Sequence, residues 1–294
     1  EYKEELTIFL EKEELKLTEG IKIHTHLKKL KELRELKNFI LSSNNLKNLP
    51  NSITNLRKLE RLMLSNNELE YLPESFGNLS TLSTLYRSYN NIFKLPLSFW
   101  ELEQIKWIDC RSNKINDISL IGHLSTLTGL DLSKNRITLL PDSINQLKEL
   151  KSIYISYNQI ERVPNSLSGL TSLIRLEMDK NNLTKYPLAL KDLNSLTLLS
   201  LSENKLKHIP KSIGLLQNIE KLSLNSNGLK KLPKTIGSLV NLQELSLFGN
   251  ELKQLPNSIS NLQELRVLNL RANSFSEKEK EKIKKSLPNC NVLF

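Results

Sequence analysis

The sequence predicts an α/β solenoid, in which short parallel strands line one face and short helical turns line the other. Two observations lead to this prediction. Asn recurs every 23 residues from Asn44 to Asn273, with a single spacing of 22. Nine of the ten prolines recur at the same interval of 23, apart from one gap of 45 between Pro96 and Pro141. A fixed period of roughly 20 to 50 residues is the signature of stacked, repeated structural units.

Each unit reads L-x-x-L-x-L-x-x-N-x-L-x-x-L-P-x-x-I-x-x-L-x-x, and residues 150–172 are a representative example. The alternating L-x-L segment predicts a short strand with one buried face. The Asn amide has a donor and an acceptor, so at each turn it can satisfy backbone groups of its own and the neighbouring coil. Pro suits the first turn of a short helix, whose Ile and Leu then face inward. One unit cannot bury its apolar face alone, so stability requires the stack.

This pattern resembles the leucine-rich-repeat family, and eleven units cover residues 36–275. The resemblance implies a right-handed solenoid, or horseshoe, with a parallel β-sheet on the concave face and short helical or 3-10 segments on the convex face. Residues 1–35 depart from the pattern and are expected to form an N-terminal cap. Within them, residues 15–23 predict a hairpin around Glu19-Gly20.

Residues 276–294 are expected to form a C-terminal cap, because a terminal unit would otherwise expose its core. Ser276 followed by Glu279 predicts a capping box at the start of a helix. Ile283 and Leu287 would pack inward from that helix. Residues 290–294 predict a last edge strand.

The sequence lacks the motifs of common enzymes. It contains no phosphate-binding glycine loop, no G-x-S-x-G and no H-E-x-x-H. Cys110 replaces Leu at an inward position, where a small buried side chain is expected. The four His residues do not supply the three or four ligands that a zinc site needs. We therefore expect no enzymatic activity, no cofactor and no bound metal.

Cysteine usage and net charge limit the cellular compartments and the kinds of partner that fit this sequence. Cys110 and Cys290 lie about seven repeats apart in a linear stack, too far for a disulfide, which fits a cytosolic protein or a bacterial secreted one. The net charge is +10, from 42 basic and 32 acidic residues. Lys and Glu alternate along the variable positions, so we expect a soluble surface and no nucleic-acid partner. No apolar run approaches the ~18 residues of a membrane span, and no signal peptide is visible after Glu1.

The variable strand positions predict one shared binding surface on the concave face. Tyr, Trp and Arg are enriched at interface hot spots, and exposed Met63, Tyr86 and Trp107 would form an apolar patch if they were in contact. A second, smaller apolar candidate is Leu198 with Phe248 and Val267. Alternatively, such side chains merely cover their neighbours on the sheet. The candidate binding residues are Met63, Tyr86, Tyr89, Trp107, Asp109, Arg111, Asp131, Tyr154, Tyr157, Glu177 and Asp179.

Asp109 and Asp131 occupy the same position in adjacent units and are predicted to be direct neighbours. Close carboxylates raise one pKa or hold a cation, or a base such as Arg111 neutralises them. The repeat is irregular in the same region. Arg87 replaces an inward apolar residue, and the only 22-residue unit has Ser119 in place of Pro. Arg87 is predicted to reach toward solvent, pair with an acid or mark a shifted strand; drift in a tolerant repeat is the alternative.

The L-P-x-x-I-x-x-L consensus and the segment SFSEKEKEKIKKSLPNCNVLF (274–294) resemble leucine-rich-repeat proteins of bacteria, especially of Leptospira. This resemblance implies an exported or surface-associated protein that engages host or envelope proteins, and we expect it to act as a monomer. The consensus is also similar to the intracellular Ras-group repeats of plants and animals. That similarity implies instead a cytoplasmic scaffold for a GTPase or another signalling protein, since fold does not fix function.

Overall fold

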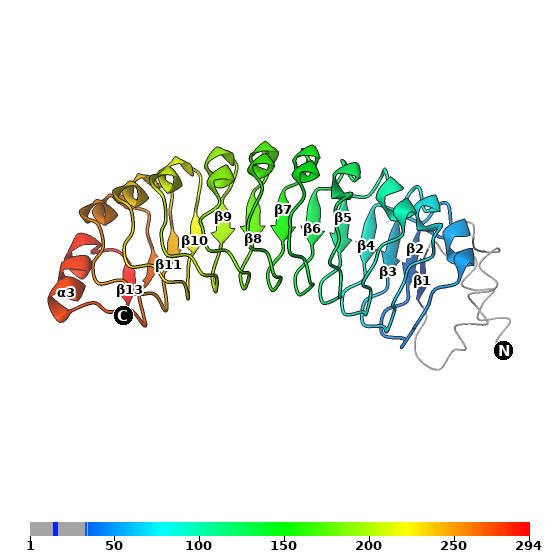
Figure 1. Ribbon diagram of the computed structural model, residues 1–294, viewed down its shortest axis with the longest axis horizontal. Helices are drawn as coiled ribbons and strands as arrows, with labels where there is room; N and C mark the ends of the chain where they lie inside the picture. The colour runs from blue at the N-terminus through cyan, green and yellow to red at the C-terminus, as the bar shows by residue number, and fades with distance from the viewer. Residues whose placement is uncertain (1–13, 17–32, 34) are drawn as a thin grey trace. The chain divides into compact units, whose positions relative to one another are not determined.

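The computed structural model describes residues 14–16, 33 and 35–294. The chain forms two compact units, Glu1–Arg136 and Ile137–Phe294, here called the N-terminal and the C-terminal unit. Both are built from the same coil, in which a three-residue strand alternates with a short 3-10 turn (Figure 1). The described part of the chain contains no helix long and apolar enough to cross a membrane.

The N-terminal unit contains a parallel sheet whose strands follow chain order, each paired in register with the next. Most of the hairpin predicted over residues 15–23, including its turn at Glu19-Gly20, lies outside the described residues; its first two residues belong to the strand Glu14–Lys16, which is parallel to the next strand. The elements are β1 (Glu14–Lys16), β2 (Asn38–Ile40), η2 (Asn51–Asn55), β3 (Arg61–Met63), η3 (Phe76–Asn78), β4 (Thr84–Tyr86), η4 (Leu97–Glu101), β5 (Trp107–Asp109), η5 (Ile121–His123) and β6 (Gly129–Asp131).

The C-terminal unit repeats this arrangement and ends in an α-helix and a further parallel strand. Its elements are η6 (Asp142–Gln146), β7 (Ser152–Tyr154), η7 (Asn165–Gly169), β8 (Arg175–Glu177), η8 (Leu188–Asp192), β9 (Leu198–Ser200), η9 (Lys211–Leu215), β10 (Lys221–Ser223), η10 (Lys234–Ser238), β11 (Glu244–Ser246), η11 (Asn257–Asn261), β12 (Val267–Asn269), α3 (Glu277–Ser286) and β13 (Asn291–Leu293).

The strands bury one face, as their period-two pattern predicts. In β3, Arg61 is exposed, Leu62 is fully buried and Met63 is half-buried. The side chain that follows each of the strands β2 to β12 turns inward again, as Leu64 does after β3. Apolar side chains therefore fill the space between the sheet and the 3-10 turns, and the remaining strand residues are displayed on the outer surface of the sheet, here called the sheet face.

The prolines precede the 3-10 turns instead of occupying their first turn, which corrects the expectation from the sequence. Pro141 is the N-cap of η6 in an extended conformation, and its carbonyl accepts from the N–H of Ile144 at 3.1 Å. A pyrrolidine ring suits this extended position because it fixes φ. Where Ser119 replaces Pro, the Asp117 carboxylate accepts from the Ser119 N–H at 2.8 Å, and η5 starts at Ile121.

The repeated Asn forms the predicted ladder of buried amides. In a typical coil, Asn181 Oδ1 accepts from the N–H of Ile160 at 3.0 Å in the preceding coil. Its Nδ2 donates to the carbonyls of Ile155 and Met178 at 3.0 and 3.1 Å. One side chain thus pairs buried backbone groups of two coils, which would otherwise lose their hydrogen bonds to water without compensation.

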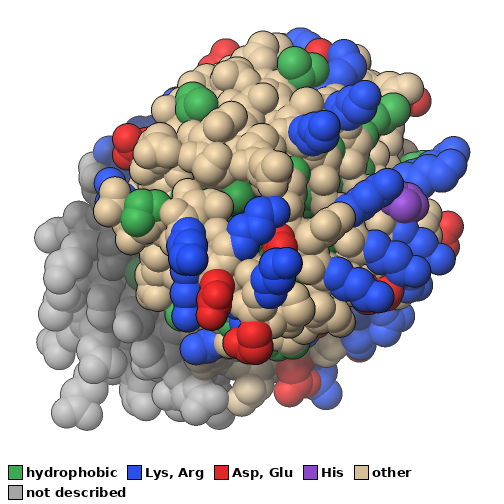
Figure 2. Space-filling model, turned by 90° about the vertical axis from the view of Figure 1, so that its left-hand side faces the viewer, with side chains coloured by type: hydrophobic (Ala, Val, Ile, Leu, Met, Phe, Trp, Pro, Cys, Tyr) green, Lys and Arg blue, Asp and Glu red, His purple; other side chains and the backbone are tan. Residues whose placement is uncertain are grey.

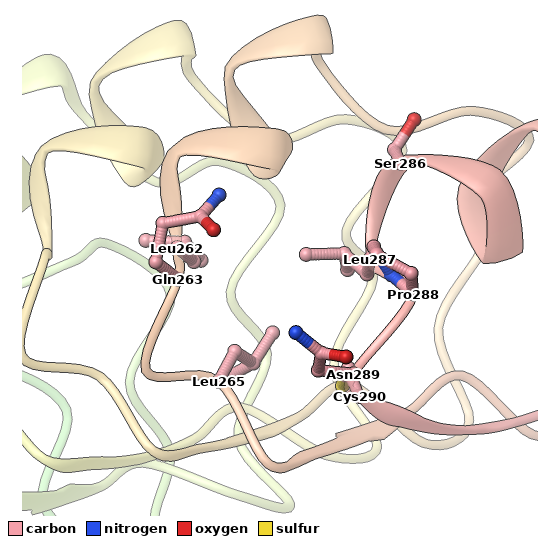
Figure 3. A pocket seen from close by; sticks show the side chains of 8 residues that line it. All are labelled: Leu262, Gln263, Leu265, Ser286, Leu287, Pro288, Asn289 and Cys290. Atoms are coloured by element: carbon pink, nitrogen blue, oxygen red, sulfur yellow. The ribbon is translucent and has the colours of Figure 1, made fainter.

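The C-terminal helix begins at the predicted N-cap Ser276, but only one half of the predicted capping box forms. The Ser276 side chain accepts from the N–H of Glu279 at 3.3 Å, while the Glu279 carboxylate accepts from Leu255 N–H of the last repeats. Ile283 and Leu287 are buried, and Figure 3 shows Leu287 projecting toward Leu262. The cavity left at this junction is ≈ 20 Å³, room for about one water. The helix therefore covers the apolar end of the stack, and β13 adds the expected edge strand.

Arg87 points into the core and does none of the three things expected of it. It is fully buried instead of reaching solvent, and no carboxylate among the described residues pairs with it. Strand β4 keeps its register with both neighbours, so no strand is shifted. Instead, Nε and Nη2 donate to Cys110 Sγ at 3.1 and 2.8 Å, and the guanidinium lies 4.9 Å from the ring centroid of Phe99.

The two irregular residues therefore explain each other. Cys110 is smaller than the usual Leu and leaves room for the guanidinium from the coil before it. Burial raises the pKa of the Cys110 thiol to about 11 against the opposing effect of Arg87, so the thiol is neutral at pH 7 and its sulfur acts as an acceptor. Phe99 in turn stacks on Phe76 at 5.9 Å between ring centroids, and a cation over an aromatic face is stabilised by the ring quadrupole.

Replacing a ladder amide should destabilise the protein. Asn181→Ala leaves the buried N–H of Ile160 without a partner and removes one of the two amide donors from the carbonyls of Ile155 and Met178, so the free energy of unfolding in urea should fall by about 1–3 kcal/mol. Asn261→Ala, at an exposed position of η11, is the matched control and should change stability by less than about 0.5 kcal/mol. Equal effects of the two substitutions would contradict the structural role of the ladder.

The Arg87–Cys110 pair should behave as one unit in a double-mutant cycle. Cys110→Leu alone adds bulk against the guanidinium and removes its acceptor, and should cost about 2–4 kcal/mol of unfolding free energy. Adding Arg87→Leu removes the buried charge and restores the apolar pattern, so the double variant should regain at least about 1–2 kcal/mol. Strictly additive effects in urea unfolding would show that the two side chains do not interact.

Candidate functional site

Seven of the eleven candidate residues belong to the N-terminal unit, and five of them are outward strand residues on its sheet face. The third residue of each strand points outward, and register places Met63 beside Tyr86, Tyr86 beside Asp109, and Asp109 beside Asp131. These side chains are all half-buried, because each leans on its neighbours along the sheet. The structure therefore brings the predicted column together as one continuous row, with an apolar end and an acidic end.

Trp107 is the largest side chain of this surface, and its position depends on a glycine. A Cβ atom added to Gly129 of β6 would lie 2.1 Å from two carbons of the Trp107 ring. One edge of the indole therefore occupies the space beside Gly129 that a side chain would fill, on the side of β5 away from Tyr86. Only a residue without a side chain permits this contact. Tyr86 and Trp107 thus present two separate aromatic surfaces on adjacent strands.

Asp109 and Asp131 are direct neighbours, as predicted. Burial raises the pKa of the Asp109 carboxyl, with the charge of Asp131 adding to the rise, while the Arg111 N–H bound at 2.9 Å opposes it. Asp131 accepts in the same way from the N–H of Ser133 at 2.8 Å. We expected that Arg111 could neutralise the two carboxylates. Among the described residues it forms no ion pair with either of them, although its positive charge lowers the pKa of the Asp109 carboxyl. The Asp109–Asp131 end of the row is therefore acidic, although Arg111 lies near it.

Tyr89 and Tyr157 stand apart from the strands, at the residue before the ladder Asn. Both have a left-handed backbone, with φ of 54° and 59°, and both are about half exposed, at 49% and 45%. Most other residues at this position share that conformation without being Gly. The turn therefore fixes the direction of two exposed rings, a feature that the sequence analysis did not foresee because neither Gly nor Pro marks it.

The C-terminal unit carries the other four candidates, and its basic residues lie over the tyrosine rings. The Arg175 guanidinium lies 5.9 Å from the Tyr154 ring centroid and its Nη1 is 3.9 Å from the Glu177 carboxylate. The Lys180 ammonium lies 4.6 Å from the Tyr157 ring centroid. Such contacts present a cation and a ring together, a combination common in protein interfaces.

Asp179 has a structural role that the sequence did not indicate. Its carboxylate accepts from Ser200 Oγ at 2.5 Å and from the Ser202 N–H at 2.6 Å. Burial raises the pKa of this carboxyl, and the hydrogen bonds from Ser200 and Ser202 oppose the rise. Asp179 therefore connects its own coil to the next coil through these two hydrogen bonds. Its carboxylate is engaged in contacts within the protein.

A further exposed aromatic pair lies off the sheet face. Tyr71 and Phe93 are 50% and 42% exposed, and their rings meet edge to face with centroids 5.0 Å apart. They belong to the segments between the ladder Asn and the Pro, in adjacent coils. Sequence reasoning missed this pair because it considered only the strand positions, although two aromatic residues in neighbouring variable segments could have signalled it.

The described residues hold no group of three or more His, Cys, Asp or Glu side chains placed to bind a metal ion. Figure 2 shows the C-terminal end of the molecule, where Lys and Arg side chains predominate, a few acidic ones lie among them and the hydrophobic ones are scattered. Ion pairs such as Lys221–Glu244 link neighbouring coils.

Comparisons with known proteins agree with the repeat and the fold. Residues 34–92 and 125–183 match the family described as "Leucine rich repeat", and residues 175–293 match "Leucine-rich repeat region". The chain is 30% identical to a leucine-rich-repeat protein of Leptospira interrogans of known structure, covering 96% of this chain and 89% of that one with a TM-score of 0.55. The chain belongs to the leucine-rich-repeat family. Members of this family are in general protein-binding modules.

Two other solved structures show how widely this leucine-rich-repeat architecture is shared. A TDR receptor is 26% identical with a TM-score of 0.81, over 92% of this chain and 48% of that one. The ectodomain of the receptor kinase GASSHO1/SCHENGEN3 from Arabidopsis thaliana is 25% identical with a TM-score of 0.56, over 90% of this chain and 39% of that one. It was solved in complex with CASPARIAN STRIP INTEGRITY FACTOR 2. No curated protein sequence matches the chain.

Gly129→Ala should displace the Trp107 ring. The added methyl group overlaps the indole, so the ring must leave the strand and become more exposed to solvent. Acrylamide quenching of tryptophan fluorescence should therefore increase, measured in a Trp100→Phe background so that Trp107 is the single emitter. Gly228→Ala is the control, because its added Cβ meets nothing closer than 3.6 Å. Unchanged quenching in Gly129→Ala would contradict the packing of Trp107 on β6.

Proposed function

We propose that this leucine-rich-repeat protein is an exported or surface-associated bacterial protein that binds a host or envelope protein through the sheet face of its N-terminal unit. The observation that carries the proposal is the row of half-exposed Met63, Tyr86 and Asp109 with Trp107 beside it. Aromatic and Met side chains are enriched in protein interfaces, and charged groups around them add specificity. The strands beneath hold these side chains at fixed spacing, so little conformational entropy is lost on binding.

The comparisons support two parts of this proposal, the bacterial origin and the binding role. The 30% identical protein comes from Leptospira interrogans and is matched over nearly its whole length. The Arabidopsis ectodomain shows that a leucine-rich-repeat structure with similar coils forms a complex with another molecule. Cys110 and Cys290 are free thiols, and the coils hold together through apolar packing and the Asn ladder. Such a protein folds without disulfides, which is compatible with a bacterial secreted protein as well as with a cytosolic one.

Substitution of the two sheet-face aromatic residues tests this function. A partner is first isolated by affinity capture from host extracellular proteins and its dissociation constant measured. Tyr86→Ala combined with Trp107→Ala should then weaken binding at least about 30-fold, which corresponds to the loss of roughly 2 kcal/mol or more from hot-spot residues. The melting temperature should change little, because both side chains are half-exposed.

The matched control for this test is Tyr71→Ala with Phe93→Ala, which removes an exposed aromatic pair of the same unit away from the sheet face. It should leave the affinity unchanged. Loss of binding in the control pair but not in the sheet-face pair would move the interface to that other surface. Recovery of the native protein only in the cytoplasm of the source cell would refute the export part of the proposal.

A further inference from the structure

The sheet face of the C-terminal unit contains a hollow of ≈ 320 Å³ over β8–β11. It exists because three successive strands carry Ser at their outward third position, where the preceding strands carry Tyr154 and Glu177. We call it the serine hollow and define it by Glu177, Ser200, Ser223 and Ser246, with Lys221 and Glu244 on one side. The larger side chains around the three hydroxyls leave a depression open to solvent.

The hydroxyls of the serine hollow are oriented by the residues beside them. Ser200 Oγ donates its proton to the Asp179 carboxylate at 2.5 Å. Ser246 Oγ donates its proton to Asn225 Oδ1 at 2.6 Å. A hydroxyl has only one proton, so Ser200 and Ser246 present lone pairs alone to the hollow. Ser223 already accepts from Asn225 Nδ2 at 3.0 Å, which fixes it in the same network.

The charges around the hollow favour a cation. Glu177 and Glu244 line it, together with Lys221, which is bound to Glu244 at 2.6 Å. Asp179 lies directly behind Ser200 and adds a third carboxylate. Counting Arg175 near Glu177 as well, the local balance is three acidic groups against two basic ones. An anion would meet carboxylates and oxygen lone pairs, so it is disfavoured on both counts.

We infer that the serine hollow binds an arginine side chain of a protein partner. A guanidinium carries five N–H donors in a planar fork and accepts none, so it matches a surface that offers acceptors from several strands about 4.8 Å apart. The half-exposed Leu198 in the lining suits the apolar stem of that side chain. This inference rests on the proposed protein-binding role, but it assigns a separate contact in the C-terminal unit.

The test uses a defined peptide, so it needs no identified partner. Acetyl-Gly-Arg-Gly-amide is titrated into the isotope-labelled protein, and backbone amide shifts are followed by NMR. Shifts should concentrate on β8–β11. The same peptide with citrulline, which has nearly the same shape without the charge, should bind at least about tenfold more weakly, because hydrogen bonds lose strength when the donor is no longer charged. Equal binding of both peptides, or shifts located elsewhere, would overturn the inference.

Two variants test the site: one fills the hollow with a larger side chain, and the other removes only a charge. Ser223→Leu fills the hollow and should abolish the arginine-dependent shifts, whereas Ser152→Leu, on the neighbouring strand β7 outside the lining, should retain them. Glu177→Gln keeps the shape and should weaken binding roughly threefold to tenfold by removing one negative charge. Retained binding in both Ser223→Leu and Glu177→Gln would refute the site. If the arginine peptide binds as expected but Tyr86→Ala with Trp107→Ala does not weaken binding of the isolated partner, the arginine site stands and the proposed function is refuted.

Discussion

The hydrogen bonds of the ladder Asn side chains are the constraint on which the coils depend. In a typical coil the amide accepts from a backbone N–H of the preceding coil and donates to carbonyls of both coils, as Asn90 does with Leu69, Leu64 and Arg87. The turn beside the strand can therefore be buried without unpaired backbone groups. Because these bonds repeat at every coil, apolar packing between strand and 3-10 turn repeats as well, and each coil stabilises its neighbours.

In this arrangement the residues that stabilise the coil differ from the residues that form the exposed surface of the sheet. Inward Leu, Ile and Asn side chains hold the coil, so the outward positions are free to vary without unfolding the stack. In the N-terminal unit they present Met63, Tyr86 and Trp107 near the Asp109–Asp131 pair. In the C-terminal unit they present small serines and a hollow. One scaffold thus offers chemically different surfaces, each held rigidly by strands only three residues long.

Residues from neighbouring coils determine details that single coils do not contain. The buried Arg87 is accommodated because the next coil supplies the small acceptor Cys110 and the ring of Phe99. The Trp107 ring reaches over the next strand because that strand has Gly129. In each case a large side chain occupies space that a small one leaves 22 or 23 residues later. The irregular coils of the N-terminal unit are therefore packed as compensating pairs.

Sequence alone determined the coil, because its Leu, Asn and Pro positions obey local rules that repeat with a fixed period. The inward and outward sides of each strand, the neighbouring position of Asp109 and Asp131, and the Ser276 cap follow from those rules. Only the tertiary structure decided that Arg87 is buried against Cys110, that Asp179 orients Ser200, and that the serines enclose a hollow. These features depend on side chains meeting across coils, where direction and volume decide the contact and spacing along the chain does not.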